Sequence, residues 1–360
     1  TKSFSETFPK NRFGITYAAY RLKRTYTLRF FLFILKNTDI MKHAILGAFA
    51  LLLSAVSCSD DDNNNGSGTP ENLVTPKISA RITEQVAQDA PFTGILEIFP
   101  CRAGGSDYFG NYINGKLTIF NGYYTIVQGD VYGNNNRELH LPIGPYNMVY
   151  WGTPKHEEPI HNSPEINSPG IVKGANLADM YFSLRPYGDG TYKPVYDLVH
   201  AVQETRIGSE ELHTGLIRVS AGLIVNLRQK DNAVFNSNVK SVKVQIGGIA
   251  EKLNFYTAEP VNQTKTVRFD LSRSEDNTTM SNATVMLFPS APNPTLELYI
   301  TLADNSIHKL TQTLNSSLSA NTLLTLNVVI GEILPEGNPG DFTITDWNEE
   351  SETIEFPTVE

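Results

Sequence analysis

The sequence predicts an all-β protein built from two antiparallel β-sandwich domains in series. Apolar and polar residues alternate along many short runs rich in Val, Ile, Thr, Tyr and Phe, and turn-forming residues separate these runs. In the run 295–302, leucine or isoleucine occupies every second position, which provides one face for a core and one face for water. Helical periodicity is scarce, and the roughly 285 residues of the folded part are enough for two domains of ordinary size.

The first 57 residues are expected to be removed from the folded protein. An apolar stretch of 13 residues, 44–56, follows Met41 and Lys42. It is shorter than the roughly 20 residues that a membrane-spanning helix needs, so it is predicted to be the core of a signal peptide. Residues 1–40 precede this complete signal, and we interpret them as upstream sequence translated by mistake or as an extension removed with the signal.

Cys58 ends the signal and is the predicted lipidation site. The segment 55–58 (Ala-Val-Ser-Cys) resembles a lipobox, in which the cysteine is acylated and becomes the first residue of the mature chain. Two or more acyl chains hold a protein stably at a membrane. The alternative is an ordinary secretory cleavage site with a cysteine beside it. Cys101 is the second of two cysteines, so no internal disulfide is expected, and we interpret it as a small buried side chain.

The mature chain is predicted to be strongly acidic. The first 57 residues hold nine of the 29 Lys and Arg and two of the 38 Asp and Glu, which leaves a formal net charge of −16 from Cys58 onward. Such a charge repels nucleic acid and anionic lipid surfaces, which argues against nucleic-acid binding. The polar, Asn- and Gly-rich residues that follow Cys58 make 58–75 a predicted flexible tether.

The folded part is predicted to divide into an N-terminal domain, 76–210, and a C-terminal domain, 211–360. The predicted strands are the alternating runs 77–83, 93–99, 116–120, 123–128, 146–151, 180–185, 216–227, 241–246, 266–271, 283–288, 295–301, 307–314, 323–330 and 342–347.

Three connecting segments have their own predictions. Asn121-Gly122 is predicted to form a hairpin turn between 116–120 and 123–128, because both positions tolerate positive φ. The segment 195–205 is predicted to be a short helix, since its apolar residues recur at helical spacing. Residues 152–178 contain four prolines and few apolar residues, which indicates a long surface loop.

The sequence contains no convincing catalytic or metal-binding motif. His156 and His161 lie five residues apart with Pro159 between them, so they cannot share a helix face as a zinc-protease signature requires. The start of a calcium loop at 61–66 lacks the Glu needed at its twelfth position. We therefore expect no enzyme activity, no metal and no cofactor, and we keep a hydrolase on a β-sandwich as a third hypothesis.

Aromatic residues support an alternative function. Tyr108, Tyr112, Tyr150 and Trp151 would form an exposed row if the protein were a surface glycan-binding lipoprotein. The competing interpretation is that these side chains fill the sandwich core or form cross-strand pairs.

Several segments resemble one family of surface proteins. Ser59, Asp60, Asp61 and Asp62, directly after Cys58, resemble the surface-export signal of lipoproteins in Bacteroides-like bacteria. Segments 141–152, 215–227, 321–329 and 344–348 resemble strands of fimbrial subunits from these organisms. In order and spacing, most of 41–350 is similar to the FimB-type fimbrial anchor group within the fimbrillin-like (type V pilus) superfamily.

This resemblance implies a fold, a role and a location. It implies two transthyretin-like β-sandwich domains with Greek-key topology, and a non-enzymatic anchor or accessory subunit of fimbriae on the outer membrane, lipid-anchored and exposed at the cell surface. It implies that pilin subunits join by β-strand addition at 77–83 or 342–356. In polymerising relatives a protease cuts after an Arg near the first strand, which makes Arg81 a candidate processing site, whereas an anchor subunit would keep this strand.

Overall fold

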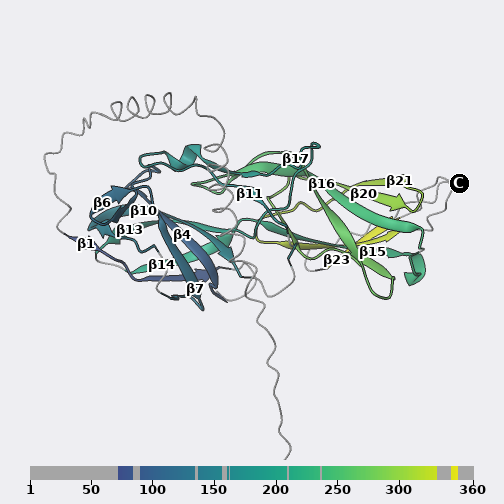
Figure 1. Cartoon of the computed structure of the whole chain (residues 1–360), viewed down its shortest axis with the longest axis horizontal. Helices are drawn as coiled ribbons and strands as arrows, with labels where there is room; N and C mark the ends of the chain where they lie inside the picture. Colours follow the sequence, from purple (N-terminus) through teal and green to yellow (C-terminus); the bar gives the residue numbers. More distant parts are fainter. Residues whose placement is uncertain are drawn as a thin grey trace, which may run out of the picture. The chain divides into compact units, whose positions relative to one another are not determined.

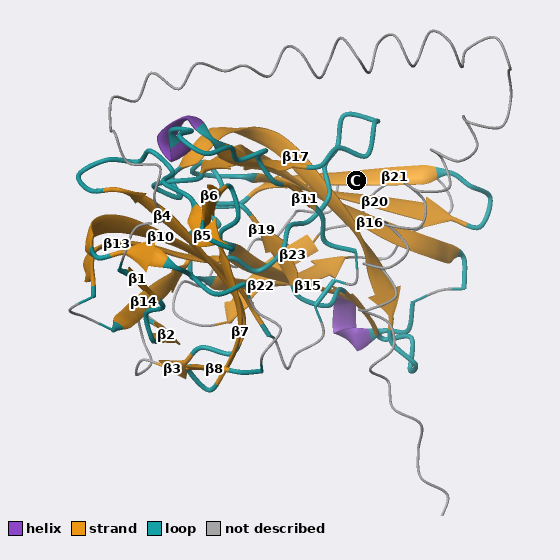
Figure 2. Cartoon of the chain, turned by 60° about the vertical axis from the view of Figure 1, so that its left-hand side comes forward, coloured by secondary structure: helices purple, strands orange, loops and turns teal. Residues whose placement is uncertain are grey.

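The described part of the chain is almost entirely β-strand. The computed structural model describes residues 72–83, 90–133, 137–155, 160–161, 163–208, 211–235, 237–330 and 342–347, all within one compact unit, Gly68–Glu360. Two 3₁₀ turns, η1 (Leu177–Asp179) and η2 (Lys230–Asn232), are the only helical elements among these residues (Figure 2). The prediction of an all-β protein with mainly antiparallel sheets is confirmed, and all fourteen predicted runs contain a strand.

The first sheet has its hydrogen-bonded strands in the order β14-β13-β10-β4-β7-β8-β2-β3. Its strands are β2 (Ile78–Ile82), β3 (Ala90–Pro91), β4 (Gly94–Arg102), β7 (Gly122–Val127), β8 (Asp130–Val131), β10 (Gly144–Pro154), β13 (Val199–Ile207) and β14 (Leu212–Arg218). An additional parallel pairing of β14 with β2 closes this path of hydrogen bonds on itself. Two short pairs accompany the sheet: β1 (Leu73–Val74) with β9 (Leu141–Pro142), and β5 (Asn111–Ile113) with β6 (Lys116–Thr118).

The second sheet follows the path β11-β12-β16-β17-β18-β15-β22-β23, with β19 paired to β15 and the β20–β21 hairpin paired to β16. Its strands are β11 (Ile166–Asn167), β12 (Tyr181–Leu184), β15 (Ala221–Gln229), β16 (Val239–Asn254), β17 (Pro260–Arg273), β18 (Thr279–Ser281), β19 (Val285–Leu287), β20 (Thr295–Leu302), β21 (Ile307–Thr313), β22 (Leu323–Ile330) and β23 (Phe342–Trp347). Figure 1 shows the two groups of strands along the chain.

One pairing recurs in both sheets. In the first sheet β2 and β14, which are its first and last strands along the chain, are parallel neighbours. In the second sheet β15 and β22 are parallel neighbours. Only residues 219 and 220 separate β14 from β15, so the chain passes directly from one parallel pair into the next. The predicted domain boundary at 210/211 falls just before β14, which pairs with the first sheet, whereas β11 and β12, earlier in the chain, pair with the second.

Two buried clusters form the core. One lies within the first sheet and contains residues such as Phe92, Leu96 and Ile126. The other belongs mainly to the second sheet, but it also includes Trp151 and Cys101 from strands of the first sheet. The apolar packing is therefore continuous between the two sheets. Burial also raises the pKa of the Cys101 thiol to about 12, which keeps it protonated and unreactive at neutral pH.

The predicted helix at 195–205 is wrong, because most of this segment forms strand β13. β13 pairs with β10 through nine registered residue pairs from Val199↔Gly152 to Ile207↔Gly144. Several of the apolar residues at helical spacing are β-branched and therefore also suit a strand. The pairing with the long strand β10 favours the strand over the helix.

The predicted hairpin at Asn121-Gly122 is also wrong. The tight turn is formed by the preceding Asn-Gly dipeptide of the chain, Asn114 (φ 52°) and Gly115 (φ 75°). It joins β5 to β6, where Ile113 is registered with Lys116. Gly122 instead begins β7 opposite Ile98. A Cβ atom on Gly122 would lie 2.7 Å from Leu139 Cγ, so glycine is needed here for close packing.

Candidate functional site

β2, the strand predicted to take part in assembly, occupies an internal position in the first sheet. It is registered with β14 over five residue pairs and contacts β3 and β8 on its other side. Its inward side chains Ile78, Ala80 and Ile82 are buried, whereas Arg81 points outward and is exposed. β2 therefore completes both the hydrogen bonding and the core of this sheet.

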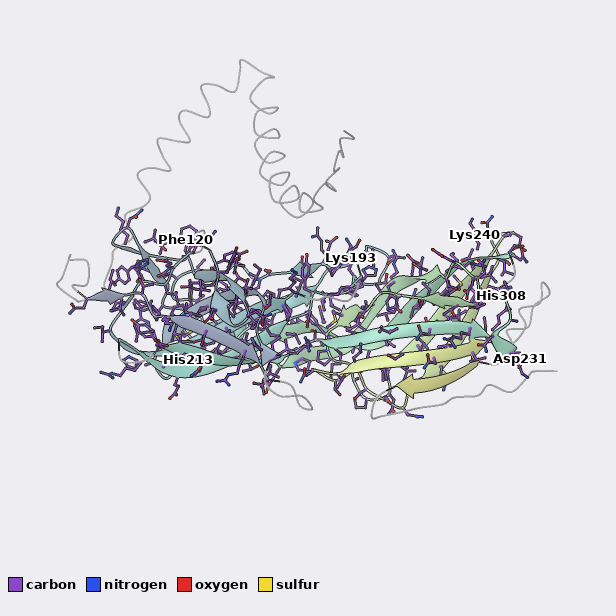
Figure 3. The ribbon with its side chains drawn as sticks, turned by 90° about the horizontal axis from the view of Figure 1, so that it is seen from below. Phe120, Lys193, His213, Asp231, Lys240 and His308 are labelled. Atoms are coloured by element: carbon purple, nitrogen blue, oxygen red, sulfur yellow. The ribbon has the colours of Figure 1, made fainter. Side chains whose placement is uncertain are left out.

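Further contacts hold the two ends and the outer face of the β2–β14 pair. Leu212 N donates to Lys77 O at 2.8 Å at one end, and Thr83 N donates to Leu216 O at 2.8 Å at the other. On the outer face, Ser79 Oγ is hydrogen-bonded to Nδ1 of His213, which Figure 3 labels. These contacts reinforce the ladder along its full length.

A buried charged group holds the connection between β14 and β15. Asp197, whose side chain is 1% exposed, accepts bonds from Arg218 Nε at 3.0 and 3.1 Å and from Ser220 Oγ at 2.8 Å. Ser220 Oγ in turn accepts a bond from Leu198 N at 3.2 Å, and Val219 N donates to Leu198 O at 2.9 Å. We call Asp197, Arg218 and Ser220 the elbow, because they set the path by which the chain leaves one sheet and enters the other.

Sequence reasoning missed the elbow. Its members come from two segments about twenty positions apart, and neither segment matches a known motif. The one available signal is a charge inside an apolar run: Asp197 lies between Tyr196 and Leu198, and Arg218 lies between Ile217 and Val219. A charge in such a position needs a buried partner.

An aromatic cluster joins the two sheets beside the elbow. Trp151 Nε1 donates to Phe255 O at 2.8 Å, and the ring centroids of Trp151 and Phe182 are 4.7 Å apart. His200 lies 4.5 Å from the same indole, and burial lowers the pKa of His200 from 6.5 to about 4. The imidazole is therefore neutral at physiological pH, and its buried Nε2 has no hydrogen-bond partner among the described residues.

The C-terminal strand β23 lies at the end of the strand path of the second sheet. It is registered with β22 over six residue pairs from Thr325↔Trp347 to Ile330↔Phe342. Within the described residues its other side has no strand neighbour, so β23 is an edge strand. Unpaired backbone groups at such an edge can template another strand.

The aromatic row expected for glycan binding does not form. Tyr108 and Tyr150 are fully buried, Trp151 is 2% exposed, and Tyr112 is partly buried. The more exposed aromatic side chains of this region include Tyr132, which is 67% exposed, and Phe120, which is 43% exposed and is labelled in Figure 3. The four residues that supported the alternative function thus belong mostly to the interior.

The predicted lipidation site and surface-export signal are not part of the described fold. Cys58, Ser59, Asp60, Asp61 and Asp62 fall outside the described residues. Within the described ranges, no group of three or more His, Cys, Asp or Glu could hold a metal ion, and no helix is long and apolar enough to cross a membrane.

One hollow lies on the surface of the first sheet. It has a volume of about 280 Å³ and lies between the turn at Ala103 and Gly104 and the strands β10 and β13, where Asn147, Glu204 and Arg206 contribute to its wall.

Comparison with known proteins identifies the family. The family described as "Fimbrillin-A associated anchor proteins Mfa1 and Mfa2" matches residues 70–353. No curated protein matches the chain at a significant level.

Two solved structures are similar to this chain. An adhesin candidate from Bacteroides ovatus is 11% identical, with 78% of this chain and 96% of that chain covered and a TM-score of 0.50. The fimbrial anchor protein Mfa2 from Porphyromonas gingivalis is 12% identical, with coverage of 77% and 98% and a TM-score of 0.49. Because the family match spans most of the chain, this protein belongs to the family of fimbrillin-A associated anchor proteins.

Proposed function

We propose that this protein is a lipid-anchored accessory subunit of surface fimbriae that joins pilin subunits through its strand edges. Family membership carries the proposal, because the family match at 70–353 includes both β2 and β23. In this proposal Cys58 carries the lipid at the outer membrane, residues 59–62 direct export to the cell surface, and 58–75 is the tether of a non-enzymatic protein.

The environments of β2 and β23 support different roles in assembly. β2 is paired on both sides and buries three side chains, which fits an anchor subunit that keeps its first strand and is not processed at Arg81. β23 has one strand neighbour among the described residues, so an extended pilin segment could add beside it and gain backbone hydrogen bonds.

A matched pair of proline substitutions tests the role of β23. Thr343→Pro removes a backbone donor from β23, and Thr311→Pro makes the same change in β21, another edge strand, which pairs with β20. Pilin should co-purify with the Thr311→Pro variant and not with the Thr343→Pro variant, both measured on exported protein. A chain truncated before Phe342 should behave like Thr343→Pro. Unchanged pilin capture by the truncated chain would contradict the proposal.

The lipid anchor has a separate test. The Cys58→Ala variant should leave the membrane fraction and appear in the soluble fraction, because the proposed acyl chains supply the attachment. Continued retention of this variant in the membrane fraction would refute anchoring at Cys58.

A further inference from the structure

We propose that the two parallel strand pairs and the elbow between them form a mechanical clamp that carries tension through the protein. The load enters at the N-terminal end of β2, passes through hydrogen bonds to β14, follows the chain through the elbow into β15, and passes through hydrogen bonds to β22. The biological source of the load rests on the proposed anchor function, whereas the clamp itself is a property of the fold.

The direction of the strands decides how the hydrogen bonds share the load. Because β2 and β14 are parallel, pulling β2 from its N-terminal end and β14 from its C-terminal end slides one strand along the other. All five registered pairs, from Ile78↔Leu212 to Ile82↔Leu216, then resist together. The same holds for the eight pairs of β15 and β22, with β15 pulled from its N-terminal end and β22 from its C-terminal end. Pulling two strands apart from the same end would instead break the pairs one after another.

Side chains strengthen both pairs against sliding. In the first pair Leu212 and Leu216 of β14 are at most 1% exposed and face the core with the buried residues of β2. In the second pair Asn226 Nδ2 donates to Asn327 Oδ1 at 3.1 Å across the registered position, and Leu326 and Val328 are at most 1% exposed. Sliding either pair would therefore disrupt buried packing as well as hydrogen bonds.

The elbow transfers the load from one pair to the other. Tension on β14 and β15 pulls on residues 219 and 220, which are fixed by the bonds of Arg218 and Ser220 to the buried carboxylate of Asp197. Asp197 directly precedes Leu198, whose backbone N–H and C=O both bond to this connection. The connection is therefore held by side-chain and backbone bonds to residues 197 and 198 and does not act as a free hinge.

Single-molecule force spectroscopy can compare two loading directions on the same ladder. Both versions use the full chain with Cys58→Ser and one handle at Lys77→Cys, while Cys101 stays buried and unlabelled. The second handle is at Lys230→Cys, just after β15, for sliding, or at Glu211→Cys, just before β14, for separation from one end. Lys77 and Glu211 form an exposed ion pair at 3.6 Å whose loss costs little.

We expect rupture of the β2–β14 pair at a force several-fold higher in the sliding geometry than in the separating geometry. In the separating geometry the rupture is recognised by the increase in chain extension that follows it. The roughly 135 residues between the two handles can extend by up to about 460 Å. Equal rupture forces in the two geometries would overturn the clamp. Loss or retention of pilin co-purification bears on the proposed anchor function alone, so the two proposals can fail separately.

Discussion

Replacing Asp197 by alanine tests how strongly the elbow stabilises the protein. The substitution removes the acceptor of two bonds from Arg218 Nε and one bond from Ser220 Oγ, all between 2.8 and 3.1 Å. It also leaves the Arg218 guanidinium, whose side chain is 20% exposed, without its carboxylate. The variant should therefore be less stable while its strand pairings remain possible.

The expected loss follows from the burial of the two charges. A hydrogen bond to a charged group contributes about 1.5–3 kcal/mol, and removing one partner of a buried ion pair costs about 3–5 kcal/mol. Because Arg218 is one-fifth exposed, water can solvate part of its charge in the variant. We therefore expect a loss near the lower limit, about 3 kcal/mol in the free energy of unfolding.

Urea unfolding followed by intrinsic fluorescence measures this loss. The control is Lys77→Ala, which removes an ion pair to Glu211 Oε1 of 3.6 Å in which the lysine side chain is 73% exposed. The control should shift the unfolding midpoint little, because solvent screens such pairs. A loss below about 1 kcal/mol for Asp197→Ala, which is the range of an exposed pair, would show that the elbow does not contribute as a buried ion pair.

Three further predictions follow from single positions. Folding holds the pKa of His200 at about 4, below 6.5 in the unfolded chain, so its stabilising contribution is complete above pH 6.5 and is lost as the pH falls towards 4. Between pH 7 and 4.5, His200→Phe should therefore lose about 2 kcal/mol less stability than the unmodified protein, and equal losses in urea titrations would contradict this. Gly122→Ala should cost about 1–3 kcal/mol by overpacking against Leu139, whereas Gly170→Ala, whose added Cβ would have no neighbouring atom within 4 Å, should unfold at an unchanged or higher urea concentration; equal effects would disprove the packing argument. Trypsin should leave the Arg81–Ile82 bond intact in the folded protein and cut it in urea, as N-terminal sequencing of the fragments would show, because β2 is paired on both sides; rapid cleavage under native conditions would argue against a retained first strand.

Local alternation predicted the strands reliably where one face is buried. In β20, Leu296, Leu298, Ile300 and Leu302 are all at most 3% exposed, as the pattern indicates. A period of two residues is a direct consequence of strand geometry, so it can be read without knowing the partner strand.

The errors have a common physical origin. The segment 195–205 carries apolar residues at helical spacing, and only its pairing with β10 makes most of it a strand. Asn114-Gly115 and Asn121-Gly122 are the same dipeptide, yet one forms a turn and the other begins a strand against Leu139. Each outcome depends on residues that are distant in the sequence.

Local residue patterns were enough to predict the all-β class, the positions of many strands and the resemblance to a fimbrial anchor family. The parallel pairing of β2 with β14, more than a hundred residues away, and the ion pair of Asp197 with Arg218 at the elbow could be seen only in the folded chain. The backbone groups of a strand need hydrogen-bond partners on a neighbouring strand, and a buried charge needs an opposite charge beside it. In both cases the partner is distant in the sequence, so the local residue pattern does not identify it.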